Sequence, residues 1–221
     1  MDQSADQLMS SKAHWEAIFR NAKSNEVSWY QPHLRLSMRL FTRAGVSVRS
    51  SVIDIGGGDS TLVDDLLAKG IQDVTVLDIS PEALSRARER LGANAESVRW
   101  IEADVTRAQL PSSYFDVWHD RAVFHFLVNR QERAAYTRIL GSALRPSGYV
   151  IVATFAPDGP TRCSGLPTVR YSPSELQAEL GPLYELIEAE PENHRTPFGA
   201  EQRFVYCLLQ KRIENLNRTG T

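Results

Sequence analysis

A glycine-rich turn that directly follows a short apolar run constrains the fold of this chain more than any other feature. The run Ser51–Ile55 (SVIDI) has the composition of a buried strand, and three glycines, Gly56–Gly58, follow it. Thr61–Lys69 then carries apolar residues at helical spacing and stops at Gly70. A glycine turn between a strand and a helix lets a ligand approach backbone N–H groups closely. We therefore predict a ligand site at this turn.

Short apolar runs alternate with helical patterns along the next hundred residues. The further predicted elements are the strands Val74–Asp78, Ser97–Glu102, Phe115–His119 and Gly148–Thr154, and the helices Pro81–Leu91 and Arg130–Leu144. Ser80 and Pro81 suit the start of a helix, and Pro146 suits a helix stop. Strands that alternate with helices indicate βαβ units and a parallel sheet covered on both faces.

The pattern changes near both ends of the chain. A short helix, Ser172–Leu180, precedes two strand-like runs, Tyr184–Ala189 and Phe204–Gln210, which a polar loop with Pro191 and Pro197 joins. This arrangement predicts an antiparallel pair at the sheet edge. The first 48 residues hold two helical segments, around Lys12–Asn21 and Pro32–Ala44.

The expected fold is α/β: a doubly wound, seven-stranded, mostly parallel sheet with an antiparallel last strand and an N-terminal helical cap. We expect residues 1–221 to form a single domain. Within it, residues 1–48 would be the cap or lid, 49–210 the ligand-binding core and 211–221 a C-terminal tail.

Charge and composition exclude several classes of protein. The 221 residues include 25 Lys and Arg and 27 Asp and Glu, for a formal net charge of −2, so binding of nucleic acid by bulk positive charge is disfavoured. No apolar signal core or membrane-length apolar stretch is present, and we expect a cytoplasmic protein without membrane partners. Two cysteines and no repeated His, Cys or Asp spacing predict no metal site.

The acids around the glycine turn indicate which ligand binds. Asp78 ends the second strand, where an acid can bind ribose hydroxyls; the alternative is a tight turn with a surface Asp. The dinucleotide fingerprint needs a third spaced glycine where this chain has Thr61, which disfavours an NAD-dependent oxidoreductase. Asp54 and Asp59 flank the turn and would repel a pyrophosphate. They suit a ligand with an ammonium and a sulfonium group, such as S-adenosylmethionine.

Four motifs in order resemble class I S-adenosylmethionine-dependent methyltransferases. They are DIGGGDS with the VLD acid, Glu102-Ala103-Asp104, Phe115–Asp120 (FDVWHD) and Arg145–Gly148 (RPSG), in which Ser147 replaces a glycine of the usual turn. The resemblance extends from about Ser51 to Gln210 and is closest to a bacterial type-12-like group. That group shares HWE, VSW, DRAVFHFL, CSGL and HRTPFG with this chain.

The resemblance implies roles for individual residues of the cofactor site. Gly56, Gly57 and Gly58 would support the methionine moiety, Asp54 its amino group and Asp78 both ribose hydroxyls. Asp104 would meet the adenine amino group. The other positions assigned to the cofactor are Asp59, Ser60, Ile79, Val105, His119, Trp29 and Tyr30. The product would be S-adenosylhomocysteine.

Candidate acceptor residues follow the fourth predicted strand. Asp120, Arg121 and His125 leave the strand at its ligand-binding end, and His125 has a reference pKa suited to a general base. The alternatives are a core histidine and an Asp120–Arg121 ion pair that orients the loop. Trp15, Trp29 and Tyr30 are candidates for an aromatic lid, although a helical tryptophan such as Trp15 can also only anchor its helix.

Two segments after the fifth predicted strand have both a functional and a structural interpretation. Cys163 is a possible contact for a soft substrate or an ordinary buried thiol. The segment His194–Gly199 either borders the acceptor pocket or forms a rigid turn.

The sequence therefore predicts methyl transfer from S-adenosylmethionine, and a small-molecule acceptor is the favoured hypothesis. A protein-lysine methyltransferase is the alternative, since some distant relatives methylate protein lysines. A non-catalytic S-adenosylmethionine-binding regulator is a further alternative. The sequence leaves the acceptor atom and the oligomeric state open.

Overall fold

The expected doubly wound sheet is present in the computed structural model, which describes residues 3–213 and the side chains of residues 11–213. Seven strands form one sheet in the order β3-β2-β1-β4-β5-β9-β8. They are β1 (Ser51–Ile55), β2 (Asp73–Asp78), β3 (Val98–Glu102), β4 (Phe115–Arg121), β5 (Leu144–Phe155), β8 (Tyr184–Arg195) and β9 (Glu201–Lys211). The first five pair in parallel, and β9 runs antiparallel to both β5 and β8. The predicted fold class is confirmed.

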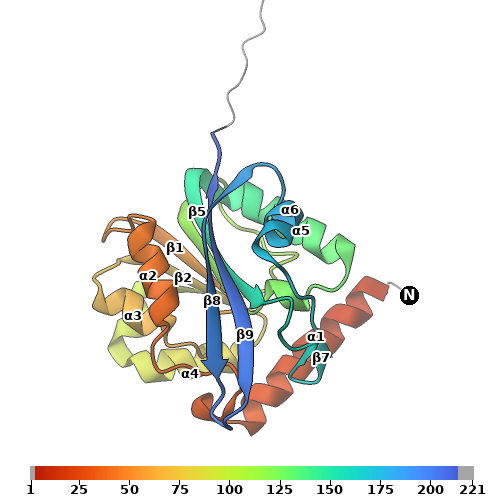
Figure 1. The fold of residues 1–221 in the computed structure, drawn as a ribbon. Helices are drawn as coiled ribbons and strands as arrows, with labels where there is room; N and C mark the ends of the chain where they lie inside the picture. Colours follow the sequence, from red (N-terminus) through yellow and green to blue (C-terminus); the bar gives the residue numbers. More distant parts are fainter. Residues whose placement is uncertain (1–2, 214–221) are drawn as a thin grey trace, which may run out of the picture.

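Helices cover both faces of the sheet (Figure 1). The described helices are α1 (Gln3–Asn21), α2 (Arg35–Arg43), α3 (Leu62–Ala68), α4 (Pro81–Leu91), α5 (Arg130–Ala143) and α6 (Pro173–Leu180). Short 3-10 helices lie at η1 (Ser24–Glu26), η2 (Gly92–Ser97) and η3 (Phe124–Phe126), and a small hairpin joins β6 (Arg162–Cys163) to β7 (Leu166–Pro167).

Alternating strand side chains divide the core into two layers. In β1, Ile53 and Ile55 face the α5 and α6 side, where Tyr136 and Leu176 are fully buried. Val52 faces the other way, toward the layer of α2, α3 and α4. Because successive strand residues point to opposite faces, a run of five apolar or buried residues needs helices on both sides.

Local signals predict several helix starts correctly. The Ser80 hydroxyl accepts a hydrogen bond from the N–H of Ala83 at 3.2 Å, and Pro81 is the first residue of α4. Ser172 and Glu175 form a reciprocal capping box at the start of α6.

Two predicted segments differ from the structure. Strand β4 continues through Asp120 and Arg121, which pair with Val152 and Ala153 of β5, so these residues are not part of a loop. Strand β8 continues through Pro191, where the sequence pattern predicts a polar loop. Proline is tolerated there because β8 is an edge strand of the sheet.

The chain reverses its direction of winding between β1 and β4, which are neighbours in the sheet. In open α/β sheets, ligands bind beyond the carboxyl ends of strands at such a switch point. The ends of these strands therefore mark the first place to look for a site. No helix within residues 3–213 is long and apolar enough to span a membrane.

Candidate functional site

The glycine turn after β1 leaves no room for side chains. A Cβ atom added to Gly57 would lie 2.6 Å from Asp54 Oδ2, and one added to Gly58 would lie 2.7 Å from Asp78 Oδ2. Gly56 and Gly58 also have positive φ angles of 62° and 42°. The turn therefore forms a backbone cradle bordered by two carboxylates, which fits a cationic ligand placed against the glycines.

Asp54 is buried beside a histidine from the neighbouring strand. Its Oδ1 lies 2.7 Å from His119 Nδ1, and His119 Nε2 lies 2.9 Å from the Ser37 hydroxyl of α2. The His119 ring also stacks on Phe41, with ring centroids 5.6 Å apart. These contacts fix the orientation of Asp54 while its other oxygen borders the glycine turn.

Asp78 ends β2 next to the same turn and is 6% exposed. Burial, together with the charge of Asp54, raises the pKa of Asp78 to about 7, although the Ser80 N–H donates to its Oδ1 at 2.8 Å. A buried carboxylate that accepts few hydrogen bonds from the protein is stabilised when hydroxyl groups of a ligand donate to it. This environment suits the predicted ribose contact.

The remaining adenosine candidates lie along the ends of β2 and β3. Ile79, Asp104 and Val105 line a cavity of about 190 Å³ together with Asp78. Asp104 Oδ1 accepts hydrogen bonds from the N–H and the hydroxyl of Thr106, both at 2.8 Å, which fix the orientation of its carboxylate. The structure thus brings the predicted ribose and adenine residues together.

A smaller cavity lies directly at the glycine turn. It is lined by Asp54, Gly56–Gly58, Asp59, Ser60, Tyr30 and His119, among others. Five residues line both cavities: Phe19, Trp29, Ile55, Gly56 and Arg121. The two cavities therefore lie next to each other and share part of their lining.

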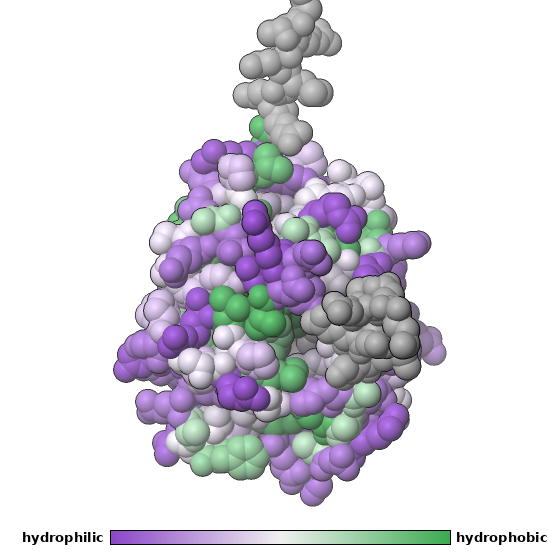
Figure 2. Space-filling model, turned by 90° about the vertical axis from the view of Figure 1, so that its right-hand side faces the viewer, coloured by the Kyte–Doolittle hydropathy of each residue, from purple (hydrophilic) through white to green (hydrophobic). Residues whose placement is uncertain are grey.

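Aromatic side chains from the N-terminal segment cover the larger cavity. The Trp15 ring lies 5.8 Å from that of Trp29 and 5.0 Å from that of Phe126, and Phe19 lies 6.1 Å from Trp29. Apolar residues gather beside a recess near the middle of this side of the molecule (Figure 2). The site is thus walled by aromatic rings as well as by acids.

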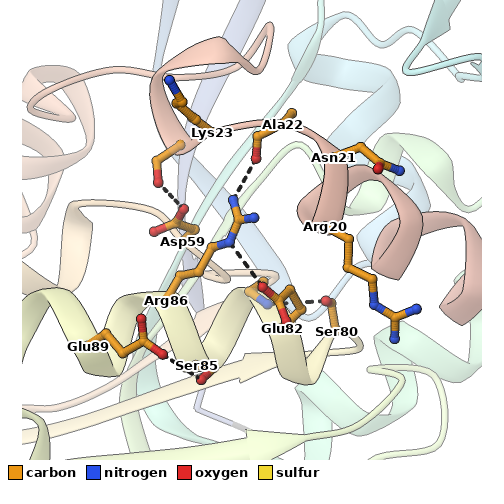
Figure 3. Close-up of polar contacts among 12 residues, drawn as sticks. Arg20, Asn21, Ala22, Lys23, Asp59, Ser80, Glu82, Ser85, Arg86 and Glu89 are labelled. Atoms are coloured by element: carbon orange, nitrogen blue, oxygen red, sulfur yellow. Dashed lines mark hydrogen bonds and ion pairs between the residues drawn. The ribbon is translucent and has the colours of Figure 1, made fainter.

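Polar contacts fasten the N-terminal segment to α4 and to the glycine turn. Glu16 of α1 accepts from the Ser80 hydroxyl at 2.6 Å, and Arg86 donates to the Ala22 carbonyl at 2.6 Å. Ser24 donates to the Asp59 carboxylate. Figure 3 shows Asp59 beside Arg86, which reaches the Ala22 carbonyl. The Asp59 carboxylate also pairs with Arg90. The Asp59 carboxylate is therefore neutralised by a basic side chain of the protein, whereas no ion pair with a basic side chain is found for Asp78 among the described residues.

Asp120 and His125, two candidate acceptor residues, lie in the core instead. Asp120 is fully buried and accepts hydrogen bonds from the Tyr136 hydroxyl at 2.7 Å and the Val123 N–H at 2.9 Å. His125 is also fully buried, and its Nδ1 accepts from the Phe155 N–H at 3.3 Å. Burial lowers the pKa of His125 to about 3, which leaves it neutral. Neither side chain lines the two cavities, and we propose a structural rather than a catalytic role for both.

Arg121, the third candidate, does reach the site. Its side chain is 7% exposed and lines both cavities. The guanidinium donates to the Tyr206 hydroxyl at 2.7 Å and to the Trp29 carbonyl at 2.9 Å, and it lies 5.0 Å above the Phe204 ring. Its Nη2 lies 3.7 Å from a carboxylate oxygen of Glu192 but makes no hydrogen bond.

Several cavity residues were not predicted from the sequence. Phe19, Phe126, Leu166, Gln202 and Phe204 line the larger cavity. The alternation of β9 places Gln202 and Phe204 on one face, but only the tertiary arrangement shows that this face borders a site. Cys163 also lines the cavity, and burial raises the pKa of its thiol, so the thiol is protonated at neutral pH. His194 is buried outside both cavities, where its Nε2 meets the Ser28 carbonyl at 2.7 Å.

Comparisons with known proteins show similarity to methyltransferases. Residues 52–148 match a family model described as a methyltransferase domain. An uncharacterized methyltransferase of Mycobacterium tuberculosis is 39% identical over 104 residues, which are 47% of this chain and 50% of that protein. The eEF1A lysine and N-terminal methyltransferase of Mus musculus is 25% identical over 126 residues, 57% of this chain and 18% of that protein. The matched part of the chain spans half the length, or less, of these curated relatives.

The fold is shared with solved methyltransferases. The 1,6-didemethyltoxoflavin-N1-methyltransferase of Burkholderia thailandensis, solved with S-adenosylhomocysteine, has a TM-score of 0.72 at 20% identity, over 96% of this chain and 90% of that one. The glycine cradle and the acids near the ends of β1, β2 and β3 line the two cavities beyond the carboxyl ends of these strands, where open α/β sheets bind ligands. Residues 52–148 thus match the methyltransferase-domain family, and the chain shares its fold with a methyltransferase solved with S-adenosylhomocysteine.

Proposed function

We propose that this protein transfers a methyl group from S-adenosylmethionine to a small-molecule acceptor. The observation that supports the proposal best is that the cavity at the glycine turn and the larger, aromatic cavity share Trp29, Gly56 and Arg121 in their linings. The glycines and the strand-end acids of the two cavities suit the cofactor, and the aromatic residues of the larger cavity suit an acceptor.

Each group of residues has a defined part in binding. The glycine turn supports the methionine moiety, and Asp54, oriented by His119, holds its amino group. Asp78 takes the ribose hydroxyls. Asp104, Val105 and Ile79 surround the adenine. Tyr30 and Ser60 border the methionine end, and Asp59 fastens the lid through Ser24.

The cofactor supplies a methyl group on a sulfonium, which is already an activated leaving group. The protein therefore has to place the acceptor about 3 Å from the methyl carbon and to exclude water. Trp15, Trp29 and Phe126 form a covered wall suited to that task. We assign residues 1–48 the role of a lid because the contacts of Glu16 with α4 and of Ser24 with the glycine turn hold Trp15 and Trp29 over the cavity.

A protein-lysine acceptor is less well supported. The name of the Mus musculus relative includes lysine methylation, which gives this alternative its basis. A lysine ammonium is better stabilised beside a carboxylate, whereas the wall between the two cavities carries the guanidinium of Arg121. The aromatic cover also leaves less space for a folded partner than an open acidic cleft would.

The test is incubation with methyl-labelled S-adenosylmethionine and a cell extract separated into small-molecule and protein fractions. Label transferred to the small-molecule fraction is expected, and it should depend on Asp78, so Asp78→Ala is the control. Label found only in protein would favour the lysine alternative. Cofactor binding without labelling of either fraction would favour a non-catalytic regulator.

A further inference from the structure

A buried cation stands between the predicted methionine site and the acceptor end of the larger cavity. Arg121 lies at the end of β4, lines both cavities and is 7% exposed. Two of its nitrogens hold the Tyr206 hydroxyl and the Trp29 carbonyl, so the position of the guanidinium is fixed. The third, Nη2, is buried and makes no hydrogen bond, although a carboxylate oxygen of Glu192 lies 3.7 Å away. A fixed, charged nitrogen whose two N–H groups make no hydrogen bond is suited to an anionic ligand atom.

The carboxylates of the larger cavity lie at its other end. Asp78 and Asp104 follow β2 and β3, whereas Arg121, Cys163 and Gln202 follow or belong to β4, β5 and β9. Strand β1 lies between these two halves of the sheet. Glu132, in the first turn of α5, also lines the cavity, and its pKa is raised by burial and further by the charge of Asp104.

The acceptor end therefore offers no general base among the described residues that line it. The Cys163 thiol stays protonated because burial raises its pKa. Arg121 and Gln202 cannot accept a proton at neutral pH. Asp120 and His125 lie outside the cavity and are occupied in the core. An acceptor bound here must already carry a nucleophilic electron pair, and the positive charge of Arg121 favours one that is anionic.

The walls of this end are flat and apolar. Trp15, Trp29 and Phe126 lie on one side, and Phe204 lies beneath the guanidinium. A second polar atom, Gln202 Oε1, is buried without a hydrogen-bond partner and belongs to a residue that lines the cavity. Aromatic walls with one cationic donor and one amide favour a planar ring with a charged substituent.

We propose that the acceptor is a flat aromatic molecule whose nucleophile is an anionic sulfur or oxygen atom, a thiolate or a phenolate, held beside Arg121. The inference rests on the proposed methyl transfer and names its substrate class. The acceptor loses its proton to solvent on binding. Its sulfur or oxygen then forms a bond to the methyl carbon while the bond from that carbon to the sulfonium sulfur breaks. The electron pair of the broken bond stays on the cofactor sulfur, so both products are uncharged at the reacting atoms.

The first test measures ionisation of a bound probe. 4-Nitrophenol changes its absorbance when it ionises, and S-adenosylhomocysteine allows the complex to form without methyl transfer. The pKa of the bound phenol should be lower by about 1–3 in the wild-type complex than in water. An unchanged or raised pKa of the bound phenol would contradict the inference.

The variants are chosen so that no buried charge is left without its partner. Arg121→Met alone would leave Glu192 buried without its partner, so the double variant Arg121→Met/Glu192→Gln is compared with Glu192→Gln. The double variant should lose the lowering of the phenol pKa, and Glu192→Gln should retain it. Arg203→Met is the control for removal of a cation outside the cavity, since Arg203 is exposed and pairs with Asp158.

The second test measures turnover with 4-nitrothiophenol, 4-nitrophenol and 4-nitrobenzylamine. Methylation of the thiol or the phenol, but not of the amine, is expected. The relative turnover of the thiol and the phenol shows whether sulfur or oxygen is the preferred nucleophile. In the double variant, kcat/KM should fall at least about tenfold, the effect of losing roughly 1.4 kcal/mol. The affinity for S-adenosylmethionine should stay unchanged.

The contrary results are distinct. Preference for the amine, or no methylation of either anionic compound by a protein that binds the cofactor, would overturn the inference. If the double variant binds the cofactor more weakly but the acceptor equally well, Arg121 contacts the methionine carboxylate rather than the acceptor. That result would also overturn the inference. Absence of cofactor binding in the wild-type protein would instead contradict the proposed function.

Discussion

His119 Nδ1 lies 2.7 Å from Asp54 Oδ1, and the two residues are direct neighbours across β1 and β4. His119 is 1% exposed and Asp54 3% exposed, so the contact joins two buried polar groups. Ser37 holds the second ring nitrogen from α2. The acid proposed to bind the methionine amino group is therefore positioned by the strand that carries Arg121.

Replacing His119 should weaken cofactor binding through its effect on Asp54. His119→Phe leaves Asp54 buried without its neighbour, and a hydrogen bond to a charged group contributes about 1.5–3 kcal/mol. The dissociation constant for S-adenosylmethionine, measured by calorimetry, should rise about tenfold or more. Ser37→Ala should have a smaller effect because it removes only a neutral hydrogen bond. Equal affinity in wild type and His119→Phe would contradict the positioning role.

Asp78 should make the cofactor-free protein less stable as pH rises. Burial raises the pKa of Asp78 from 3.8 to about 7, so the folded state binds this proton more tightly than the unfolded state does. The stability that protonated Asp78 contributes is present below about pH 4 and is lost as pH rises through 7. Asp78→Asn should therefore have a higher Tm than wild type at pH 8, with the difference shrinking toward pH 4. A Tm difference independent of pH would exclude this assignment.

Glu16 should matter for the attachment of the lid. It accepts hydrogen bonds from the Ser80 hydroxyl and the Glu82 N–H at the start of α4. Removing such an interaction at a helix N-terminus costs about 0.5–2 kcal/mol. Glu16→Ala should lower the Tm by a few degrees and raise the KM for S-adenosylmethionine. Arg20→Ala removes only the exposed ion-pair partner of Glu16 and should change both far less. Equal effects of the two substitutions would argue against the assigned role of Glu16.

Asp120 and His125 should affect stability more than chemistry. Asp120→Ala leaves the Tyr136 hydroxyl and two backbone N–H groups without their acceptor in the core, at about 1–3 kcal/mol for each unsatisfied group. A lowered Tm with preserved kcat in the folded fraction is expected. His125→Gln should retain turnover at saturating cofactor. Loss of kcat with an unchanged Tm in either variant would restore a catalytic role.

Sequence patterns predict the parts of the fold that depend on local rules. The strand–glycine–helix unit at Ser51–Gly58, the N-cap of Ser80 and the capping box of Ser172 are set by neighbouring residues. The continuation of β8 through Pro191 is not predictable in this way. Tolerance of proline depends on the strand being at the sheet edge, which is a property of the assembled sheet.

The site shows the same division between local and long-range information. Asp54, Asp78 and Asp104 follow strand ends, and parallel strand ends meet at one edge of a sheet, so their grouping was predictable. The burial of His125 was not predictable from the sequence. A short 3-10 helix at Phe124–Phe126 turns its ring between Phe126 and Phe155. Gln202 and Phe204 reach the cavity only through the antiparallel pairing of β9 with β5.

A calorimetric titration with S-adenosylmethionine, and separately with NAD⁺, tests the central claim most directly. The wild-type protein should bind S-adenosylmethionine at one site and should not bind NAD⁺. Asp78→Ala should bind the cofactor more weakly, by about 1.5–3 kcal/mol for each hydrogen bond from a ribose hydroxyl that the substitution removes. Binding of NAD⁺ without binding of S-adenosylmethionine, or unchanged affinity in Asp78→Ala, would contradict the assignment of this site.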